Sequence, residues 1–363
     1  MRYKKFFALL LALALVCGSL SGCAAGQTAA PAEPAVSFTD SLGRTVDIPE
    51  TLTRVAPSGA VASMFLATIA PEYMATINAT PSSSQYKYLD PRLIELPTTG
   101  QMYGSKSTLN LESILSSGAQ AVIDLGDKKD NIAADLDALQ RQLGMPVIFI
   151  EADLPHMAEA YRTLGKVLSG KEARGEELAA FVEETVSMAE ENAAKIQDAE
   201  RISVLYTSGS SGLNTNAKGS IQAQVLDLMG IENAAVVEDV SNKGGGNPIN
   251  LEQLYRFDPD VILFAAGSIY QTAAVDEAWQ PLRAIEAGRY YEIPSMPYNW
   301  LSNPPSLNML LGVWWLGNLL YPQYYAYDMV EKAQEMFRLF WSYDLSADEA
   351  RAMLANSTLK DAP

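Results

Sequence analysis

Two stretches of the chain, which begin 140 positions apart at residues 109 and 249, carry one pattern. They are LNLESILSSGAQAVID, residues 109–124, and INLEQLYRFDPDVILF, residues 249–264. They align without a gap, so an Asn-Leu-Glu triplet is followed in both by an apolar run at the same distance. An asparagine in front of a helix is a good N-cap, because its side chain accepts a hydrogen bond from a free backbone N–H of the first turn. The repeat therefore predicts a short helix followed by a strand, present twice, in a chain with two similar halves.

Apolar runs of strand length alternate with helical patterns along both halves. Continuous apolar runs between turn residues are typical of parallel strands that are buried on both faces. Strands that alternate with helices favour two α/β lobes with mostly parallel, Rossmann-like sheets. The predicted strands lie near Arg54–Ala56, Tyr73–Ala79, Ala121–Leu125, Pro146–Glu151, Arg201–Thr207, Val236–Val240, Val261–Ala266 and Arg289–Ile293.

A long helix is predicted between the two copies of the repeat. Lys171–Lys195 contains no proline, and its apolar residues recur at helical spacing with glutamates on the other face. A helix of this length would be about 37 Å long, the width of a domain. We interpret it as a stiff connection between the lobes; the alternative is a surface helix within one domain.

The first residues have the pattern of an export signal. Three basic residues in the first five positions precede an apolar run, Phe6 to Val16, that is too short to span a bilayer. The sequence LSGC, Leu20 to Cys23, has the small residues and cysteine that a bacterial lipoprotein signal peptidase cleaves. Cys23 is therefore predicted to be a lipidated N-terminus on a flexible tether, Ala24 to Val36. The alternative is an ordinary secretory signal with a chance cysteine.

Composition excludes several classes of protein. The formal net charge is −17, and removing the three basic residues of the signal makes it −20, which repels nucleic acid. Cys17 would leave with the signal and Cys23 would carry lipid, so no disulfide or cysteine metal site is expected. No stretch after the signal is long and apolar enough to cross a membrane, so the expected body is anchored only through its lipid. The length suits two lobes, at roughly 100–200 residues per domain.

The order of several segments resembles the substrate-binding proteins of ABC importers for cobalamin and ferric siderophores. The resemblance runs from about Phe38 to Phe340. It is carried by FTDSLGRTVDIP as an opening hairpin, TRVAP as a first strand, the two helix-then-strand repeats, and SGLNTNAKGSIQAQVLDLMGIENA as the start of the second lobe. It implies two Rossmann-like lobes joined by a single long helix, with the ligand in the cleft between them.

The resemblance also suggests why the glutamate of the repeat is duplicated. In that family each lobe carries an exposed glutamate that pairs with arginines of a permease dimer, and by position these are Glu112 and Glu252. The alternative is local, because a carboxylate in a first turn interacts favourably with the helix dipole by about 0.3–1 kcal/mol. The expected partners are thus a permease dimer with its ATPase and a small-molecule metal chelate, and the protein is expected to be a monomer.

Loops that follow strands hold the candidate ligand contacts, because ligands bind beyond the carboxyl ends of strands in open α/β sheets. Ser58 and Gly59 follow the first strand and could offer backbone N–H groups to an anion, or could simply begin an ordinary helix. The other candidates in such loops are Tyr206, Asn214, Lys218 and Tyr270, and the segment before the first helix of the repeat, Gly100 to Ser107, adds Tyr103 and Lys106.

A proline-rich loop after the last predicted strand is the most unusual segment. Residues 293–305 contain four prolines around Tyr298, Asn299 and Trp300, which suits a wall for a flat organic ligand. The following segment, 306–320, is predicted to be an apolar helix whose Trp314 and Trp315 pack in the core.

The metal options are narrowed by a single histidine. His156 lies at a predicted helix start and is expected to be a cap or surface residue, whereas sites for bare Zn²⁺ or Mn²⁺ normally use several imidazoles. A chelated metal needs no protein ligand, which favours a ferric siderophore, with haem or a corrinoid as alternatives. An oxyanion such as molybdate also remains open, because backbone amides can hold one.

Enzyme signatures are missing from the sequence. GSSG, residues 209–212, lacks the Gly-x-Ser-x-Gly spacing of a nucleophile elbow, and GKEARGEE, residues 170–177, lacks the Lys-Ser/Thr of a phosphate loop. KGGGNP, residues 243–248, is interpreted as a cleft loop. We therefore expect a binding protein without catalytic residues or a cofactor; a lipid-anchored enzyme or sensor on the same scaffold is the alternative.

These patterns predict an organisation into six segments. They are a signal peptide (1–22), a tether (23–36), an N-terminal lobe (37–155), a connecting region (156–199), a C-terminal lobe (200–345) and a tail (346–363).

Overall fold

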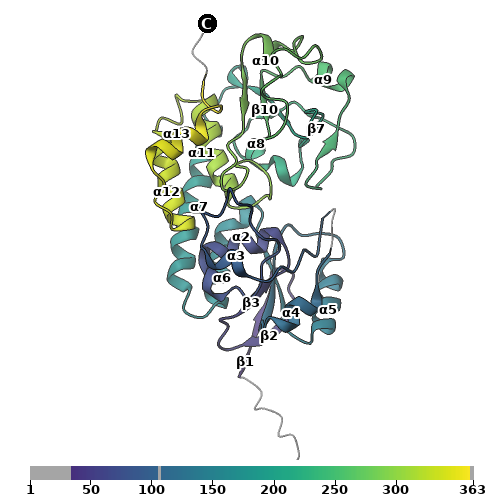
Figure 1. Cartoon of the computed structure of the whole chain (residues 1–363), viewed down its shortest axis with the longest axis vertical. Helices are drawn as coiled ribbons and strands as arrows, with labels where there is room; N and C mark the ends of the chain where they lie inside the picture. Colours follow the sequence, from purple (N-terminus) through teal and green to yellow (C-terminus); the bar gives the residue numbers. More distant parts are fainter. Residues whose placement is uncertain (1–33, 105–107, 360–363) are drawn as a thin grey trace, which may run out of the picture. The chain divides into compact units, whose positions relative to one another are not determined.

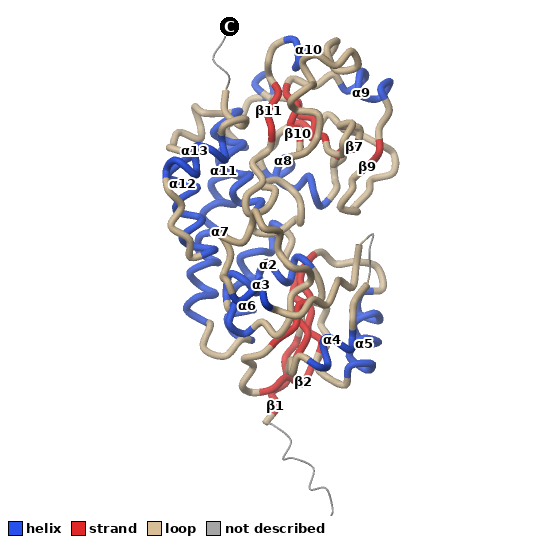
Figure 2. Tube along the Cα trace, in the orientation of Figure 1, coloured by secondary structure: helices blue, strands red, loops and turns tan. Residues whose placement is uncertain are grey.

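Two separate, parallel sheets organise the chain in a computed structural model that describes residues 34–104 and 108–359 (Figures 1 and 2). The first sheet has the order β3-β4-β5, formed by Val55–Pro57, Ala121–Gly126 and Val147–Glu151. The second has the order β11-β10-β6-β8, formed by Tyr290–Glu292, Val261–Phe264, Ser203–Thr207 and Glu232–Asn233. All pairs within both sheets are parallel, which confirms the predicted two-lobe α/β fold.

Each sheet is buried on both faces because successive side chains of its strands point alternately into two cores. In the first sheet Val55, Ile123 and Ile148 belong to the large central core, whereas Val122 and Phe149 belong to a smaller core on the opposite face. In the second sheet Val204, Val261 and Leu263 join the same central core, and Leu205, Ile262 and Phe264 point to another small core. The continuous apolar runs in the sequence follow from this double burial.

The long helix is confirmed as α7, Glu172–Ala193, of 22 residues. It packs antiparallel to α6, Met157–Val167, where Gly175 comes so close to α6 that a Cβ there would lie 2.6 Å from the Tyr161 carbonyl oxygen. Its residues Leu178, Ala179 and Val182 belong to the central core that also receives strands from both sheets. The connection between the lobes is therefore a packed helix.

Further helices cover the sheets and α7 (Figure 1). In the first half they are α2 (Ala60–Ile69), α3 (Arg92–Glu95), α4 (Leu111–Ser116) and α5 (Ile132–Leu143). In the second half they are α8 (Gln224–Leu228), α9 (Leu251–Phe257), α10 (Arg283–Glu286), α11 (Asn308–Leu320), α12 (Met329–Trp341) and α13 (Ala347–Leu354). The predicted apolar helix is α11, and Trp314 and Trp315 are buried in it as expected.

Two small antiparallel pairs complete the strands. β1, Ala35–Thr39, pairs with β2, Thr45–Pro49, which confirms the opening hairpin. β7, Asn214–Thr215, pairs with β9, Asn247–Pro248. No helix among the described residues is both long and apolar enough to span a membrane.

The duplicated unit has the predicted form in both copies. Asn110 caps α4 by accepting a hydrogen bond from Ser113 N at 3.0 Å, and α4 leads into the central strand β4. Asn250 caps α9 by accepting from Gln253 N at 2.9 Å, and α9 leads into the central strand β10. The Asn-Leu-Glu triplet therefore marks equivalent positions in the two sheets.

Two strand predictions are wrong. Val236–Val240 is a loop in which Val236 and Val240 are exposed, and the strand of this region is β8, which ends three residues before Val236. Tyr73–Ala79 forms only isolated bridges, from Met74 to Val55 and from Ile77 to Thr98. The chain changes partner within three residues there, so neither ladder can extend.

Candidate functional site

A polar pocket lies at the carboxyl ends of β3, β4 and β5. Its cavity volume is about 270 Å³. Three loops that follow strands contribute to it, at Ser58–Gly59, Gly126–Asp127 and Ala152. The second half of the chain supplies the opposite wall, with Ile221, Gln222, Asn242, Gly244 and Asn303–Pro305. We call this the first pocket.

A second pocket, of about 440 Å³, lies at the carboxyl ends of β6 and β10. It is lined by Tyr206, Ser208, Gly209, Asn214, Gly244, Gly245, Ala265, Ala266, Ser295, Asn299 and Asn303. Gly244 and Asn303 line both pockets, and Asn303 Nδ2 donates a hydrogen bond to the Gly244 carbonyl oxygen at 3.2 Å. The two pockets thus adjoin, and together they form a cleft with the strand ends of both sheets at its sides.

A larger recess, of about 690 Å³, lies among α2, α3 and α12. It is lined by residues such as Glu72, Lys87 and Trp341 and is not at a carboxyl edge of either sheet. Because ligands of open α/β sheets bind beyond the strand ends, the cleft is the better candidate site.

The first pocket contains the beginning of α2. Residues 58–62 line it, and the N-cap Gly59 offers no side chain to the free N–H groups of the first turn. No acidic residue lies in that turn. Free N–H groups at a helix start favour negative charge, so this wall supplies hydrogen-bond donors.

Asp124 lies at the floor of the first pocket and is 4 % exposed. It belongs to β4, where its side chain accepts a hydrogen bond from Ser58 Oγ. Burial raises the pKa of Asp124 to about 6, against the lowering by the Ser58 hydrogen bond and by the more distant Lys129. A carboxylate that costs free energy to ionise is thus placed where a ligand would contact it.

Two other polar atoms in this pocket have no hydrogen-bond partner among the described residues. Gln222 is 5 % exposed, and its Nε2 donates to the Asn242 carbonyl oxygen at 3.0 Å while its Oε1 is left unpaired. The hydroxyl of Tyr103 is also unpaired, and Lys129 Nζ lies 5.0 Å from the centre of the Tyr103 ring. Buried polar atoms without partners are unusual in folded proteins, and here they border a cavity.

Most of the residues that we predicted to contact ligand lie along the cleft. Ser58, Gly59 and Tyr103 line the first pocket. Tyr206, Asn214 and Asn299 line the second. Tyr298 lines a neighbouring cavity of about 200 Å³, which shares Ala60 and Pro304 with the first pocket.

Three predicted contact residues lie elsewhere. Lys218 is exposed and lines none of these three cavities, and Tyr270 packs against the rings of Phe264 and Tyr290. Trp300 is fully buried, with Nε1 donating to the Met296 carbonyl oxygen at 2.9 Å. Trp300 therefore supports the proline-rich loop from behind, and a ligand contact would require that loop to rearrange. Lys106 lies outside the described residues, as does Cys23.

Several lining residues were not predicted from the sequence: Gln101, Asp124, Lys129, Gln222, Asn242 and Asn303. Asp124 could have been identified from the sequence, because it is the one acidic residue in the apolar run that forms the buried strand β4 of the first repeat. Asn242 and Asn303 come from loops of the second half and Gln222 from a short 3-10 helix, Ile221–Ala223, and no local pattern in the sequence distinguishes these residues.

Glu112 and Glu252 occupy equivalent, exposed positions in the first turns of α4 and α9. Glu252 forms an ion pair with Arg256 of its own helix, with Oε1 and Nη2 2.9 Å apart. Exposed apolar side chains accompany them one turn later in both copies, at Leu115 and Tyr255. Both helix starts therefore present a carboxylate beside an apolar side chain.

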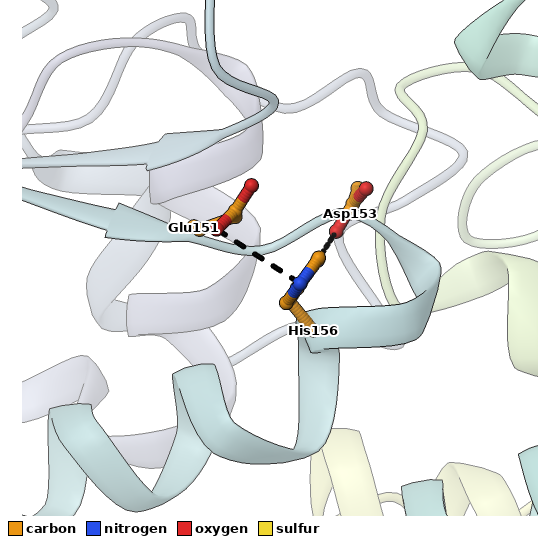
Figure 3. A group of neighbouring side chains, drawn as sticks. All are labelled: Glu151, Asp153 and His156. Carbon is orange, nitrogen blue, oxygen red and sulfur yellow. Dashed lines mark hydrogen bonds and ion pairs between the residues drawn. The ribbon is translucent and has the colours of Figure 1, made fainter. Parts of the chain in front are cut away.

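His156 lies on the surface at the start of α6, next to Glu151 and Asp153 (Figure 3). One ligand atom from each of these three residues lies within 4.8 Å of the others. Glu151 is already paired with Lys128, whose Nζ lies 2.6 Å from Oε2. The group thus offers one imidazole and two carboxylates, of which one is partly neutralised.

Comparison with known proteins supports the same architecture. The sequence profile of a family described as "Periplasmic binding protein" matches residues 55–297. No curated protein matches the chain by sequence.

Similar solved structures are binding proteins. An ABC transporter solute-binding protein from Sulfurospirillum deleyianum is 26 % identical, with a TM-score of 0.80 over 88 % of this chain and 99 % of that one. The molybdate periplasmic binding protein MolA of Haemophilus influenzae, bound to molybdate, is 17 % identical, with a TM-score of 0.69 over 86 % and 99 %. IsdE of S. aureus, in complex with haem, is 21 % identical, with a TM-score of 0.53 over 74 % and 99 %.

Proposed function

The chain belongs to the periplasmic binding protein family, and on that premise we propose that it captures a metal–chelate complex of the ferric siderophore type in its cleft and delivers it to an ABC permease. The observation that carries this proposal is the pair of adjoining pockets of about 270 and 440 Å³ at the strand ends of both sheets. Their combined size suits an organic ligand, since such sites typically measure about 300–1,000 Å³.

The side chains of the cleft favour a metal that arrives with its own ligands. Among the described residues that line the two pockets there is no histidine or cysteine, and Asp124 and Asp127 are the only carboxylates. Bare Zn²⁺ or Mn²⁺ would need more protein donors than these two groups provide. A chelated metal needs only hydrogen bonds and apolar contact, which the asparagines, glutamines, tyrosines and prolines of the cleft can supply.

An oxyanion is the second candidate, because the first turn of α2 lines the first pocket without an acidic residue. Native mass spectrometry of the protein purified from its own host separates the two. We expect a bound mass with the isotope pattern of iron. Molybdate, haem or an iron-free ligand in its place would contradict the siderophore assignment.

The docking role of Glu112 and Glu252 rests on their exposure at equivalent helix starts. Glu112→Lys/Glu252→Lys is expected to weaken association with the permease by about tenfold, because exposed charges at a rim steer association through complementary charge. Folding and ligand affinity should stay near those of the wild type. Vesicle association at two salt concentrations measures the effect.

The control for this prediction is Glu190→Lys/Glu191→Lys, which makes the same charge change at exposed positions of α7. It should leave vesicle association almost unchanged. If the docking variant associates as well as this control, the duplicated glutamates serve only their own helices.

The anchor at Cys23 is a further part of the proposal and rests on the LSGC sequence. In the host, Cys23→Ala should accumulate as an unprocessed precursor that incorporates no labelled fatty acid. Normal cleavage and lipidation of this variant would show that Cys23 is not the modified residue.

We propose that the two lobes comprise residues 37–155 and 200–345, on either side of a connecting region at 156–199.

A further inference from the structure

The buried carboxylate of Asp124 has no structural role that a neutral side chain could not fill. Its one hydrogen bond recorded within the described residues comes from Ser58 Oγ, and an amide oxygen could accept that bond equally well. Desolvation makes the charged form costly at this position. A carboxylate that lies at the floor of a ligand pocket despite this cost indicates that the ligand carries a group that binds to it.

The charges around Asp124 leave its negative charge largely uncompensated. Arg44 donates to Asp40 and Asp137 at 2.9 and 2.8 Å and is thereby committed to other acids. Lys129 lies 2.9 Å from Asp127 Oδ1, so these two pocket charges neutralise each other. The part of the chain that the structure describes contributes no arginine to the lining of the first pocket.

The opposite wall of the first pocket also presents a hydrogen-bond acceptor. Gln222 is held by the hydrogen bond from its Nε2 to Asn242, which leaves Oε1 as a buried acceptor without a partner among the described residues. Beside the N–H donors at the start of α2, the first pocket therefore offers an anionic acceptor from one lobe and a neutral acceptor from the other, and both acceptors require donors.

We propose that the cleft selects chelates whose outer face carries a protonated amine, which binds to Asp124 and Gln222. This inference rests on the proposed function and names the substrate class of that site, which is a ferric chelate with a positive charge on its outer face. A chelate with negative charge spread over its surface, such as a ferric tris-catecholate, would bring like charge against a buried carboxylate. Such contacts are strongly unfavourable when water is excluded.

The test uses ferrioxamine B, a ferric trihydroxamate with one free ammonium group, and the same chelate with that amine acetylated. A ferric tris-catecholate and molybdate complete the panel. Affinities are measured at pH 7.5 by quenching of tryptophan fluorescence and by calorimetry, with full-length processed protein.

The wild type should bind ferrioxamine B at least about tenfold more tightly than its acetylated form, which is the effect of one charge-assisted hydrogen bond. The ratio should fall to near one in Asp124→Asn. Gln222→Met, which keeps the length of the side chain without an acceptor, should weaken binding of ferrioxamine B several-fold. The control Asp348→Asn, at an exposed position outside the cleft, should keep the wild-type ratio.

Each outcome is decisive. A wild type that binds the acetylated chelate or the tris-catecholate as tightly as ferrioxamine B overturns the inference and leaves the proposed function standing. Tightest binding of molybdate overturns both, and so does a wild type that binds no ferric chelate in the panel.

Discussion

Gly312→Ala is expected to lower the free energy of unfolding by about 2 kcal/mol and to weaken ligand binding in the cleft. A Cβ at Gly312 would lie 2.3 Å from the Trp300 carbonyl oxygen and 2.9 Å from Leu301 Cδ2. Overpacking of this kind typically costs about 1–3 kcal/mol or more, and the better helix propensity of alanine returns at most about 1 kcal/mol. Because the contact is with backbone, the loop that carries Asn299 and Asn303 must shift.

Urea unfolding and ligand titration measure the two effects on the same protein. Gly144→Ala is the control, because Gly144 has a φ of +63° but open space around its Cβ position, so only backbone strain of roughly 1 kcal/mol is expected. That variant should bind ligand like the wild type. If Gly312→Ala also retains full affinity, α11 does not determine the position of the loop.

The elements that could be predicted from the sequence are those whose cause is local. The Asn-Leu-Glu repeat predicted both capped helices, because an N-cap and its hydrogen bond lie within four residues. The 22 residues of α7 repeat their apolar positions at helical spacing over several turns, so the sequence alone predicts this helix without its packing partners. The central strands followed from their continuous apolar runs.

The failures share a non-local cause. Val236–Val240 has the residues of a strand, but the pairing of this segment with β6 ends at Asn233, and Val236 and Val240 are exposed. Trp300 was expected at the pocket wall as an aromatic residue on a stiff loop, but its indole is buried in the central core, which is built from distant parts of the chain. Gln222, Asn242 and Asn303 became neighbours of Asp124 only through the meeting of the two halves.

Asp124→Asn is expected to stabilise the unliganded protein at pH 7.5 by roughly 3 kcal/mol. Burial raises the pKa of Asp124 from 3.8 to about 6, so the native state binds this proton more tightly than the unfolded chain does. The cost of ionisation is therefore absent below about pH 3.8, grows as the pH rises and is complete above about pH 6. Asparagine keeps an acceptor for Ser58 and carries no charge at any of these pH values.

The advantage of the variant should accordingly shrink to about 1 kcal/mol at pH 4.5, as measured by urea unfolding at both pH values. The charged groups that act on Asp124, namely Arg44, Lys129 and Asp127, remain the same in both proteins, as does Tyr103. Asp348→Asn should change stability little at either pH, because Asp348 is exposed. A variant that is less stable than the wild type at pH 7.5 would contradict this account of the buried charge. Saturating ferrioxamine B should narrow the difference at pH 7.5, because an ammonium group on Asp124 stabilises the ionised carboxylate of the wild type and gives the asparagine much less.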